Sequence, residues 1–498
     1  MMAVGLGGIT RHGCVALAEG SRIAGVCEQE RVTRVRNAGF NASGLPDESL
    51  DLLLERVGRT RKDVGQYVLA EEATSSKSDS PFERVEHHLA HACAAYLTSP
   101  FSTAVILVCD DELPKVSLWE GRGPTVSRMD LQWTGPGFAD AHLRCARAFG
   151  FRTPAGSQRF EALARLCRDG HGDRVTKLFE LDGPTALTVD SQHFEALEDL
   201  IDGDAGISSR AALAAAVEAR LGAVFIELLA MVRRLTTCDQ VCLAGSFFYH
   251  SSINTLAKQS GLFKEVFIPI DPGNGGLAVG AVLHACGGEP RPVSPFMGPS
   301  YSAYETKETL DNCKLQYSWE SEDTAIEIAV NALRKGQLVG WFDDAMEWGP
   351  RALGARCILA NPFDRFVLEN LNRFLKRREP WRGYAVSALP EAVPEYFEGP
   401  DAAPFMECNY RPRDPSRFSY ALPSPTAAIR LQTVHSDTPP LFRRLLRAFA
   451  TSSGLPFLIN TSFNGFNEPL VCTPRDAVRV FYGSGLDLLV IGQFVLRK

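Results

Sequence analysis

Three side chains with metal-binding chemistry stand close together in the first quarter of the sequence. Residues 86–92 read EHHLAHA, which predicts a helix with His87 and His91 four residues apart on one face and His88 pointing elsewhere. The apolar strand-like segment AVILVCD ends at Asp110, and a carboxylate at a strand end is a common third ligand. Histidines at this spacing are by themselves more often packing than metal binding. Together with the carboxylate they favour a first-row divalent ion with open coordination positions.

Four cations in the last third of the sequence interrupt segments that are otherwise apolar or rich in turns. Arg351 lies in EWGPRALGARCILANP, Lys376 and Arg382 lie in NRFLKRREPWRGYA, and Arg430 lies in AIRLQTV. Buried cations need anionic partners, and the carboxylates of this acidic chain could supply them. Four such cations fit a pocket for several phosphates better, because charged hydrogen bonds to phosphate are strong. KRREPWR could instead be a nucleic-acid patch, but nothing else in the sequence supports that interpretation.

A glycine-rich turn, PGNGGLAVG, joins a strand to a helix at residues 272–280. Glycines let a backbone approach phosphate, and a helix N-terminus offers unpaired N–H groups. A plain strand-to-helix turn explains this segment equally well. A second loop at Gly245 and Ser246 follows the preceding strand, and two such loops flanking a cleft favour a nucleotide. We therefore assign Gly245, Asn274 and Gly275 to nucleotide binding.

The elements that position these residues alternate between strands and helices, which predicts an α/β fold. VALAEG and RIAGVCEQER flank a turn at residues 19–21 and predict a hairpin, while the apolar periodicity of residues 208–235 predicts a long helix. Proline and glycine are dense at residues 287–302, which resists both helix and sheet and marks a domain boundary. We place a first domain at residues 1–290, a linker at 291–320 and a second domain at 321–498.

Composition and charge describe an ordinary globular protein. The 498 residues are 45% apolar and 22% charged with a net charge of -7, and the length favours two or three domains. A general nucleic-acid binder would more often carry a basic face, so we expect no nucleic-acid partner. No apolar run reaches bilayer-spanning length, so we expect no membrane partner either. The 13 cysteines are scattered and odd in number, which fits reduced thiols in a cytoplasm.

At these residues the chain resembles the carbamoyltransferase family of nodulation and antibiotic biosynthesis, which includes the tobramycin and cephamycin enzymes. In the second half, WGPRALGARCILANP, KRREPWR and NTSFN with EPLVCTP carry the resemblance closely. In the first half, EQERVTR, EHHLAHA, the strand end at Asp110 and GNGGLAVGAV carry it more loosely. The similarity covers nearly the whole length. It implies an actin-like (ribonuclease-H-type) N-terminal domain and a YrdC-like α/β C-terminal domain.

The resemblance also implies a reaction in two steps. The YrdC-like domain would join carbamoyl phosphate to ATP, giving carbamoyl adenylate and pyrophosphate, and the first domain would transfer the carbamoyl group to a hydroxyl of a small natural-product acceptor. The cofactors would be ATP with Mg²⁺ and a divalent metal, iron or another first-row ion, in the first domain; a homodimer is one possible assembly. Carried over residue by residue, the metal ligands are His87, His91 and Asp110, and His12 is the catalytic residue beside the acceptor. The positions matching those for carbamoyl phosphate and ATP are Arg351, Lys376, Arg382, Arg430, Asn460 and Ser462.

Three positions depart from the family pattern. Asn274 replaces the aspartate of the glycine-rich turn, and an amide is a poorer ligand for a divalent ion than a carboxylate. Gly13 replaces the aspartate that follows the N-terminal histidine, and Ser424-Pro425-Thr426 replaces Asp-Gly-Thr before the arginine strand. The first two changes bear on metal dependence and acceptor geometry, and they leave the adenylation chemistry untouched.

Two other functions stay open at this point. A threonylcarbamoyl-type tRNA modification enzyme uses similar domains, but it would be expected to carry a basic surface. A non-catalytic actin-like protein that binds nucleotide would fit Asn274, but it would have no need of a phosphate pocket. The sequence does not identify the acceptor, which could offer a sugar, polyketide or amino-acid hydroxyl, or an amine.

Overall fold

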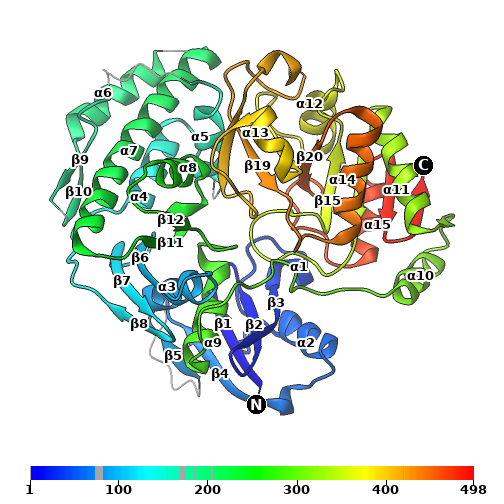
Figure 1. The fold of residues 1–498 in the computed structure, drawn as a ribbon, viewed down its shortest axis with the longest axis horizontal. Coiled ribbons are helices and arrows are strands. Elements are labelled where there is room, and N and C mark those ends of the chain that lie inside the picture. The colour runs from blue at the N-terminus through cyan, green and yellow to red at the C-terminus, as the bar shows by residue number, and fades with distance from the viewer. Residues whose placement is uncertain are drawn as a thin grey trace.

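The structure is a computed structural model of the full chain. It describes residues 2–72, 82–153, 155–168, 175–183, 185–203, 206–418 and 420–498. Helices and sheets alternate throughout these residues, which confirms the predicted α/β fold (Figure 1).

The first sheet contains the N-terminal strands in the order β3-β2-β1-β4-β5. Its strands are β1 (Met2–Gly7), β2 (Cys14–Glu19), β3 (Arg22–Glu28), β4 (Val64–Ala70) and β5 (Glu83–Val85). Strand β1 pairs antiparallel with β2 and parallel with β4, which pairs parallel with β5. Strands β2 and β3 form the hairpin that the sequence predicts.

The second sheet repeats this arrangement in the order β8-β7-β6-β11-β12. Its strands are β6 (Thr103–Cys109), β7 (Val116–Arg122), β8 (Thr125–Arg128), β11 (Gln240–Ala244) and β12 (Glu265–Phe267). Strand β6 pairs antiparallel with β7 and parallel with β11, which pairs parallel with β12. The two sheets therefore share one strand order and one set of strand directions.

Two helices pack against each other between these sheets. Helix α3 (His87–Leu97) follows β5 and packs on β6 and β11, whereas α9 (Leu277–Cys286) follows β12 and packs on β1, β2 and β4. Each helix thus covers the sheet built by the other part of the chain. Their close approach requires glycine at position 280, because a Cβ there would lie 1.9 Å from the carbonyl oxygen of Ala90.

A helical layer covers the outer side of the second sheet (Figure 1). It is built around α7 (Ile207–Leu235), which matches the helix predicted at residues 208–235 and packs on its neighbours α4, α5 and α8. Between β8 and β12 the chain also forms α4 (Phe138–Ala148), α5 (Gly156–Ala164), β9 (Phe179–Asp182), β10 (Ala186–Val189), α6 (Ser191–Asp202) and α8 (Ser251–Gln259).

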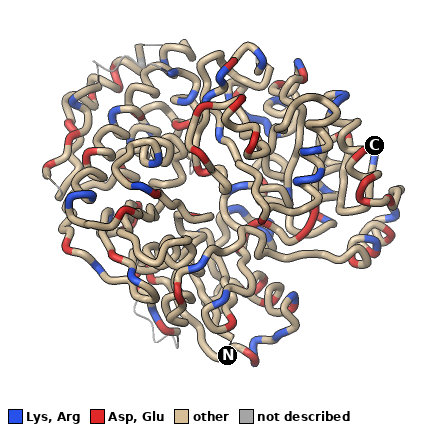
Figure 2. The backbone as a smooth tube through the Cα atoms, viewed as in Figure 1, with Lys and Arg blue, Asp and Glu red and all other residues tan. Residues whose placement is uncertain are grey.

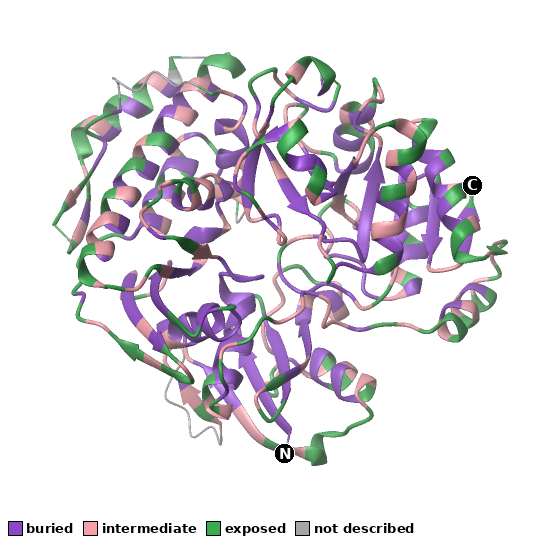
Figure 3. Ribbon diagram, viewed as in Figure 1, coloured by how far each residue is buried: buried purple, intermediate pink, exposed green. Residues whose placement is uncertain are grey.

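The C-terminal part of the chain builds a ten-stranded sheet in the order β13-β22-β21-β14-β15-β20-β16-β19-β18-β17. Its strands are β13 (Ser318–Trp319), β14 (Val339–Phe342), β15 (Arg356–Ala360), β16 (Ala385–Ala388), β17 (Phe397–Glu398), β18 (Cys408–Pro412), β19 (Ile429–Thr433), β20 (Phe457–Ser462), β21 (Leu488–Ile491) and β22 (Phe494–Arg497). Helices α11 (Glu322–Arg334), α14 (Pro440–Ser453) and α15 (Pro474–Tyr482) pack on it, and its central strands are buried (Figure 3).

The region predicted as a linker, residues 291–320, begins as extended chain and ends in regular structure. Residues 291–302 form neither helix nor strand, whereas α10 (Ala303–Asn312) and β13 lie within the predicted range, and β13 pairs with β22.

Short helices complete the fold: α1 (Gln29–Thr33), α2 (Asp47–Arg56), α12 (Val367–Glu369) and α13 (Val393–Tyr396).

The structure also bears on the cysteines and on the question of membrane-spanning helices. All 13 cysteines are free thiols. Within the residues that the structure describes, no helix combines the length and the apolar character needed to cross a membrane.

Candidate active site

One large cavity, about 960 Å³ in volume, is lined by residues from both halves of the chain. It brings together nine of the residues singled out from the sequence. They are His12, Asn274, Gly275, Arg351, Lys376, Arg382, Arg430, Asn460 and Ser462. Gly245 and the three predicted metal ligands do not line it, although their neighbours Asp111 and Ser246 do. Residues separated by up to 450 positions therefore face one common space.

The loop that carries Arg351 is held by a buried glutamate. Glu347 is fully buried, and its Oε1 accepts hydrogen bonds from the backbone N–H groups of Leu353, Ala355 and Arg356 at 2.7, 3.2 and 3.2 Å. The N–H of Gly349, in the same loop, donates to Glu28 Oε1 at 2.6 Å. Glu28 belongs to the EQER segment of the first half, so that segment fixes the loop across the two halves.

Lys376 is buried among neutral oxygen atoms. Its Nζ donates to Asn464 Oδ1 and to the carbonyl oxygen of Ser462, both at 2.6 Å, and to the carbonyl oxygen of Asn464 at 3.1 Å. Burial, together with the nearby charge of Arg378, holds the pKa of Lys376 well below its ordinary value. The ammonium group is therefore short of negative charge.

The arginines of the cavity are also poorly balanced. Arg382 lies 3.8 Å from the nearest Glu379 oxygen, and burial with the neighbouring Arg378 lowers its pKa to about 10. Arg351 donates to the carbonyl oxygen of Tyr249 at 3.3 Å, and burial lowers its pKa as well. Both guanidinium groups would gain from an anionic ligand.

Arg430 differs from these residues because it has a carboxylate partner. Its Nη2 lies 2.5 Å from Oε2 of Glu161, which is fully buried on α5 of the first half, and its Nε donates to Ser251 Oγ at 2.9 Å. Although burial opposes it, the charges of Arg430 and Arg165 hold the pKa of Glu161 well below its usual range. Of the two explanations that the sequence offered for the buried cations, pairing with a carboxylate of the chain therefore applies to Arg430.

The cavity as a whole carries an excess of positive charge. Among the described residues that line it, eleven are Lys or Arg and five are Asp or Glu. Around the outline of the molecule, by contrast, residues of both signs are mixed (Figure 2). A concave site with unbalanced cations binds ligands that carry several negative charges.

Two polar side chains of β20 complete the cation-rich wall. Asn460 donates from Nδ2 to the carbonyl oxygen of Ala352 at 3.1 Å and to Ser387 Oγ at 2.8 Å, while its buried Oδ1 has no hydrogen-bond partner among the described residues. Ser462 Oγ donates to Asn464 Oδ1 at 2.9 Å.

The first half contributes His12 and the glycine-rich turn to the opposite wall. His12 is exposed at the cavity, its backbone is left-handed with φ 59°, and enclosure by surrounding atoms lowers the pKa of its ring. The ring is therefore neutral at pH 7 and can accept a proton. Asn274 is 8% exposed and starts the turn that leads into α9.

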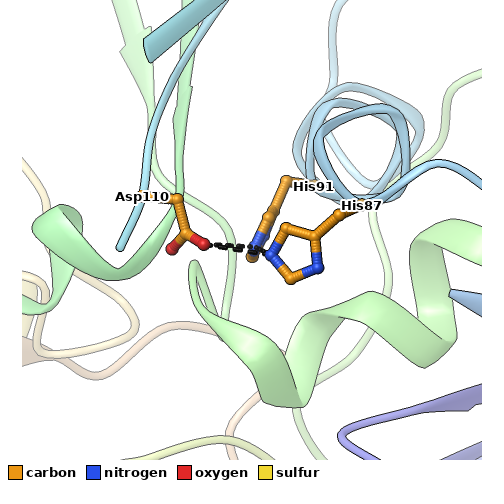
Figure 4. Close-up of side chains that lie close together, drawn as sticks. All are labelled: His87, His91 and Asp110. Carbon is orange, nitrogen blue, oxygen red and sulfur yellow. Dashed lines mark hydrogen bonds and ion pairs between the residues drawn. The ribbon is translucent and has the colours of Figure 1, made fainter. Parts of the chain in front are cut away.

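The predicted metal ligands form a compact cluster beside this wall. Their ligand atoms lie within 4.8 Å of one another, on α3 for the histidines and just after β6 for the carboxylate (Figure 4). His87 Nε2 lies 3.0 Å from Asp110 Oδ2 and 3.2 Å from His91 Nε2. Asp110 raises the pKa of His87 to about 9 against the effect of burial.

The surroundings of this cluster suit a divalent ion. His87 Nδ1 lies 2.9 Å from the carbonyl oxygen of Glu71, so Nδ1 carries a hydrogen and Nε2 is the nitrogen that faces the other two ligands. Asp110 Oδ1 accepts the N–H of Ser246 at 2.7 Å, which orients Oδ2 toward the histidines. Gly245, with φ 100°, allows this contact, because a Cβ there would lie 2.1 Å from the Cys109 carbonyl oxygen.

Comparison with known proteins identifies the family. Residues 73–283 match the model of the carbamoyltransferase N-terminus, and residues 330–498 match that of the carbamoyltransferase C-terminus. The chain belongs to the carbamoyltransferase family. It is 30% identical to the uncharacterized protein sll1178 of Synechocystis over 83% of this chain and 76% of that protein.

Two relatives with functional names and similar identity match over shorter lengths. Nodulation protein NolO of Bradyrhizobium diazoefficiens is 32% identical over 57% of this chain and 54% of its own length. The 3'-hydroxymethylcephem-O-carbamoyltransferase of Amycolatopsis lactamdurans is 30% identical over 48% of this chain and 45% of its own. Among solved structures, the activator of the 2-hydroxyisocaproyl-CoA dehydratase from Clostridium difficile aligns over 57% of this chain and 94% of its own at 16% identity, with a TM-score of 0.38.

The sequence did not single out two buried acids of this site. Glu161 pairs with Arg430, and Asp271 accepts a hydrogen bond from Tyr249; both partners line the cavity. Glu161 sits in an amphipathic helix among ordinary apolar residues, so no local pattern marks it. Asp271 directly precedes the glycine-rich turn, and its place at the end of a strand-like run is a signal that could have found it.

Proposed function

We propose that this carbamoyltransferase uses ATP and carbamoyl phosphate to form carbamoyl adenylate and then transfers the carbamoyl group to a hydroxyl of a small acceptor. The observation that carries the proposal is the single cavity, in which poorly balanced cations of the second half face His12 and the glycine-rich turn of the first. A cation-rich wall suits two phosphate-bearing substrates, and a facing wall with a neutral imidazole beside a glycine-rich turn suits transfer.

In this proposal the cations hold the phosphates. Lys376, Arg351 and Arg382 would bind carbamoyl phosphate and the triphosphate of ATP with its Mg²⁺, assisted by Arg430, Asn460 and Ser462. Bringing two polyanions together requires their charge to be neutralised, and the protein supplies this by positioning rather than by covalent chemistry. Water would release phosphate from carbamoyl phosphate, and the resulting carbamate would attack the α-phosphate of ATP and displace pyrophosphate. Carbamoyl adenylate would remain.

The facing wall would carry the transfer step. Gly245, Asn274 and Gly275 would lie along the adenylate, and His12 would contact the acceptor. His87, His91 and Asp110 would hold one divalent ion, which as a Lewis acid polarises a carbonyl placed near it. The similarity to a cephem O-carbamoyltransferase supports a hydroxyl as the acceptor group.

The domain assignments belong to the same proposal. The repeated strand order of the two five-stranded sheets supports an actin-like first domain at residues 1–290, joined through residues 291–320 to a YrdC-like second domain at 321–498. We also propose that the enzyme works in the cytoplasm, where ATP is available, with a role in antibiotic or other natural-product biosynthesis.

The test is an assay of pyrophosphate release with purified protein. Release should require both ATP and carbamoyl phosphate, and omission of either should abolish it. Nucleotide binding without release would favour the non-catalytic alternative. Carbamoylation of tRNA in preference to small hydroxyl compounds would favour the tRNA-modification alternative.

A further inference from the structure

A buried carboxylate faces the same cavity just before the glycine-rich turn. Asp271 is 5% exposed and lines the cavity together with His12 and Asn274. Its Oδ1 accepts two hydrogen bonds, from the hydroxyl of Tyr249 at 2.6 Å and from the N–H of Gly273 at 3.0 Å. These bonds fix the orientation of the carboxylate.

The other oxygen of Asp271 is left open to the cavity. Oδ2 has no hydrogen-bond partner among the described residues. It also does not belong to the fully buried polar atoms of these residues that lack a partner, so it is accessible from the cavity. The turn makes room for it: a Cβ at position 275 would lie 2.2 Å from Oδ2, so only glycine leaves this oxygen uncovered. An oriented carboxylate with one free oxygen is suited to receive a proton.

The groups packed around Asp271 support the same role. Burial and the nearby Glu28 carboxylate raise its pKa to about 6, in spite of the hydrogen bond from Tyr249 and the charge of Arg31. Two further groups interact with it electrostatically, Arg351 and Cys14. A carboxylate that titrates near neutrality is ionised at pH 7 and yet basic enough for proton transfer.

We propose that Asp271 is the catalytic base of the transfer step and accepts the proton of the attacking hydroxyl on Oδ2. The acceptor O–H bond breaks and its proton goes to Oδ2. The oxygen electron pair forms a bond to the carbamoyl carbon, and the bond from that carbon to the adenylate oxygen breaks with its electrons leaving on AMP. This inference rests on the proposed function. His12, exposed at the cavity, then orients the acceptor.

The experiment separates the two half-reactions. Pyrophosphate–ATP exchange in the presence of carbamoyl phosphate reports adenylate formation, and AMP release without added acceptor reports transfer to water, so no acceptor has to be identified. Asp271→Asn should reduce AMP release about 100-fold or more and leave exchange within about twofold. The fall of the parent's AMP release below about pH 6 should disappear in this variant, because the group that must be ionised is gone.

Two further variants make the result decisive. Asp343 is a half-buried carboxyl of the second half whose pKa is also raised to about 6, mainly by desolvation. It lies outside the large cavity, so Asp343→Asn should keep both rates. Asp271→Ala should regain AMP release when formate is added, because a free carboxylate can occupy the vacated space.

Each remaining outcome would overturn the inference. Parental AMP release in Asp271→Asn, equal losses in both half-reactions, or no formate rescue would show that Asp271 is not the base. A parent enzyme without carbamoyl-phosphate-dependent exchange would reject the proposed function itself, and the base with it.

Discussion

Replacement of Lys376 by methionine separates a binding role from a structural one. Methionine preserves most of the side-chain volume and removes the charge. Among the residues that the structure describes, the ammonium group has only neutral oxygens of Ser462 and Asn464 within hydrogen-bonding distance, and burial lowers its pKa strongly. Its charge is therefore costly to the folded protein, and we expect it to be retained for an anionic ligand.

The magnitude follows from the loss of one buried charge next to phosphate. Unit charges about 4 Å apart attract by about 4 kcal/mol at an effective dielectric of about 20. Loss of one preorganised donor in an active site costs about 2.7–4 kcal/mol. We expect Lys376→Met to raise the barrier for adenylate formation by about 3 kcal/mol, which slows pyrophosphate release roughly 100- to 200-fold.

Lys258 provides the matched control, because it is a partly buried lysine that has a carboxylate partner and lies outside the cavity. Its Nζ lies 2.7 Å from Glu407 Oε1, and this carboxylate raises its pKa against the effect of burial. Lys258→Met leaves Glu407 unpaired and should cost about 3–5 kcal/mol of unfolding free energy while keeping the rate per folded molecule. Lys376→Met should unfold at or above the parental temperature.

Pyrophosphate release and thermal unfolding, measured on both lysine variants, test this contrast. Near-parental turnover in folded Lys376→Met would refute the assignment of the cavity to phosphate binding. A large fall in its unfolding temperature would refute the argument that the charge is unbalanced. Either result would contradict the reasoning independently of the other.

Three further predictions concern the first half of the chain. Elemental analysis of protein purified without chelator should find one first-row divalent ion per chain, and His87→Ala should lose it with a larger fall in AMP release than in exchange; a metal-free protein with full transfer would refute this. Asn274→Asp should tighten metal binding in a titration and Asn274→Ala should not, and equal affinities would place Asn274 away from the ion. Glu161→Gln should cost about 3–5 kcal/mol of unfolding free energy because it leaves Arg430 buried and unpaired. Carbamoyl phosphate should then raise the unfolding temperature of this variant more than that of the parent, and an equal rise would contradict the argument.

Local patterns in the sequence were sufficient for the elements that bear the site. The spacing of His87 and His91 predicts a shared helix face, and Asp110 follows an apolar run that is indeed a strand. The cluster could therefore be predicted from the sequence alone. The long helix at residues 208–235 and the first hairpin follow equally from periodicity and turn chemistry. These features depend on neighbours within a few residues.

Features that depend on distant contacts could not be predicted in this way. Glu161 and Arg430 are 269 positions apart, and only the packing of α5 against the second half brings them together. The EQER segment matches the family loosely, but its role in holding the Gly349 loop appears only when both halves are folded. Neither contact has a sequence period or spacing that would reveal it.

The repeated sheet order explains why the remaining site residues converge. In each five-stranded sheet, three strands run parallel, β1, β4 and β5 in one and β6, β11 and β12 in the other. The chemistry-bearing residues of the first half follow the carboxyl ends of these strands, where open α/β sheets bind their ligands. They are His12 after β1, His87 after β5, Asp110 after β6, Gly245 after β11, and Asp271 with Asn274 after β12. The His87 position in one repeat corresponds to the glycine-rich turn in the other, since each opens the helix that crosses to the opposite sheet. One repeat thus supplies imidazoles for an ion, while the other supplies a backbone turn with an open carboxylate beside it.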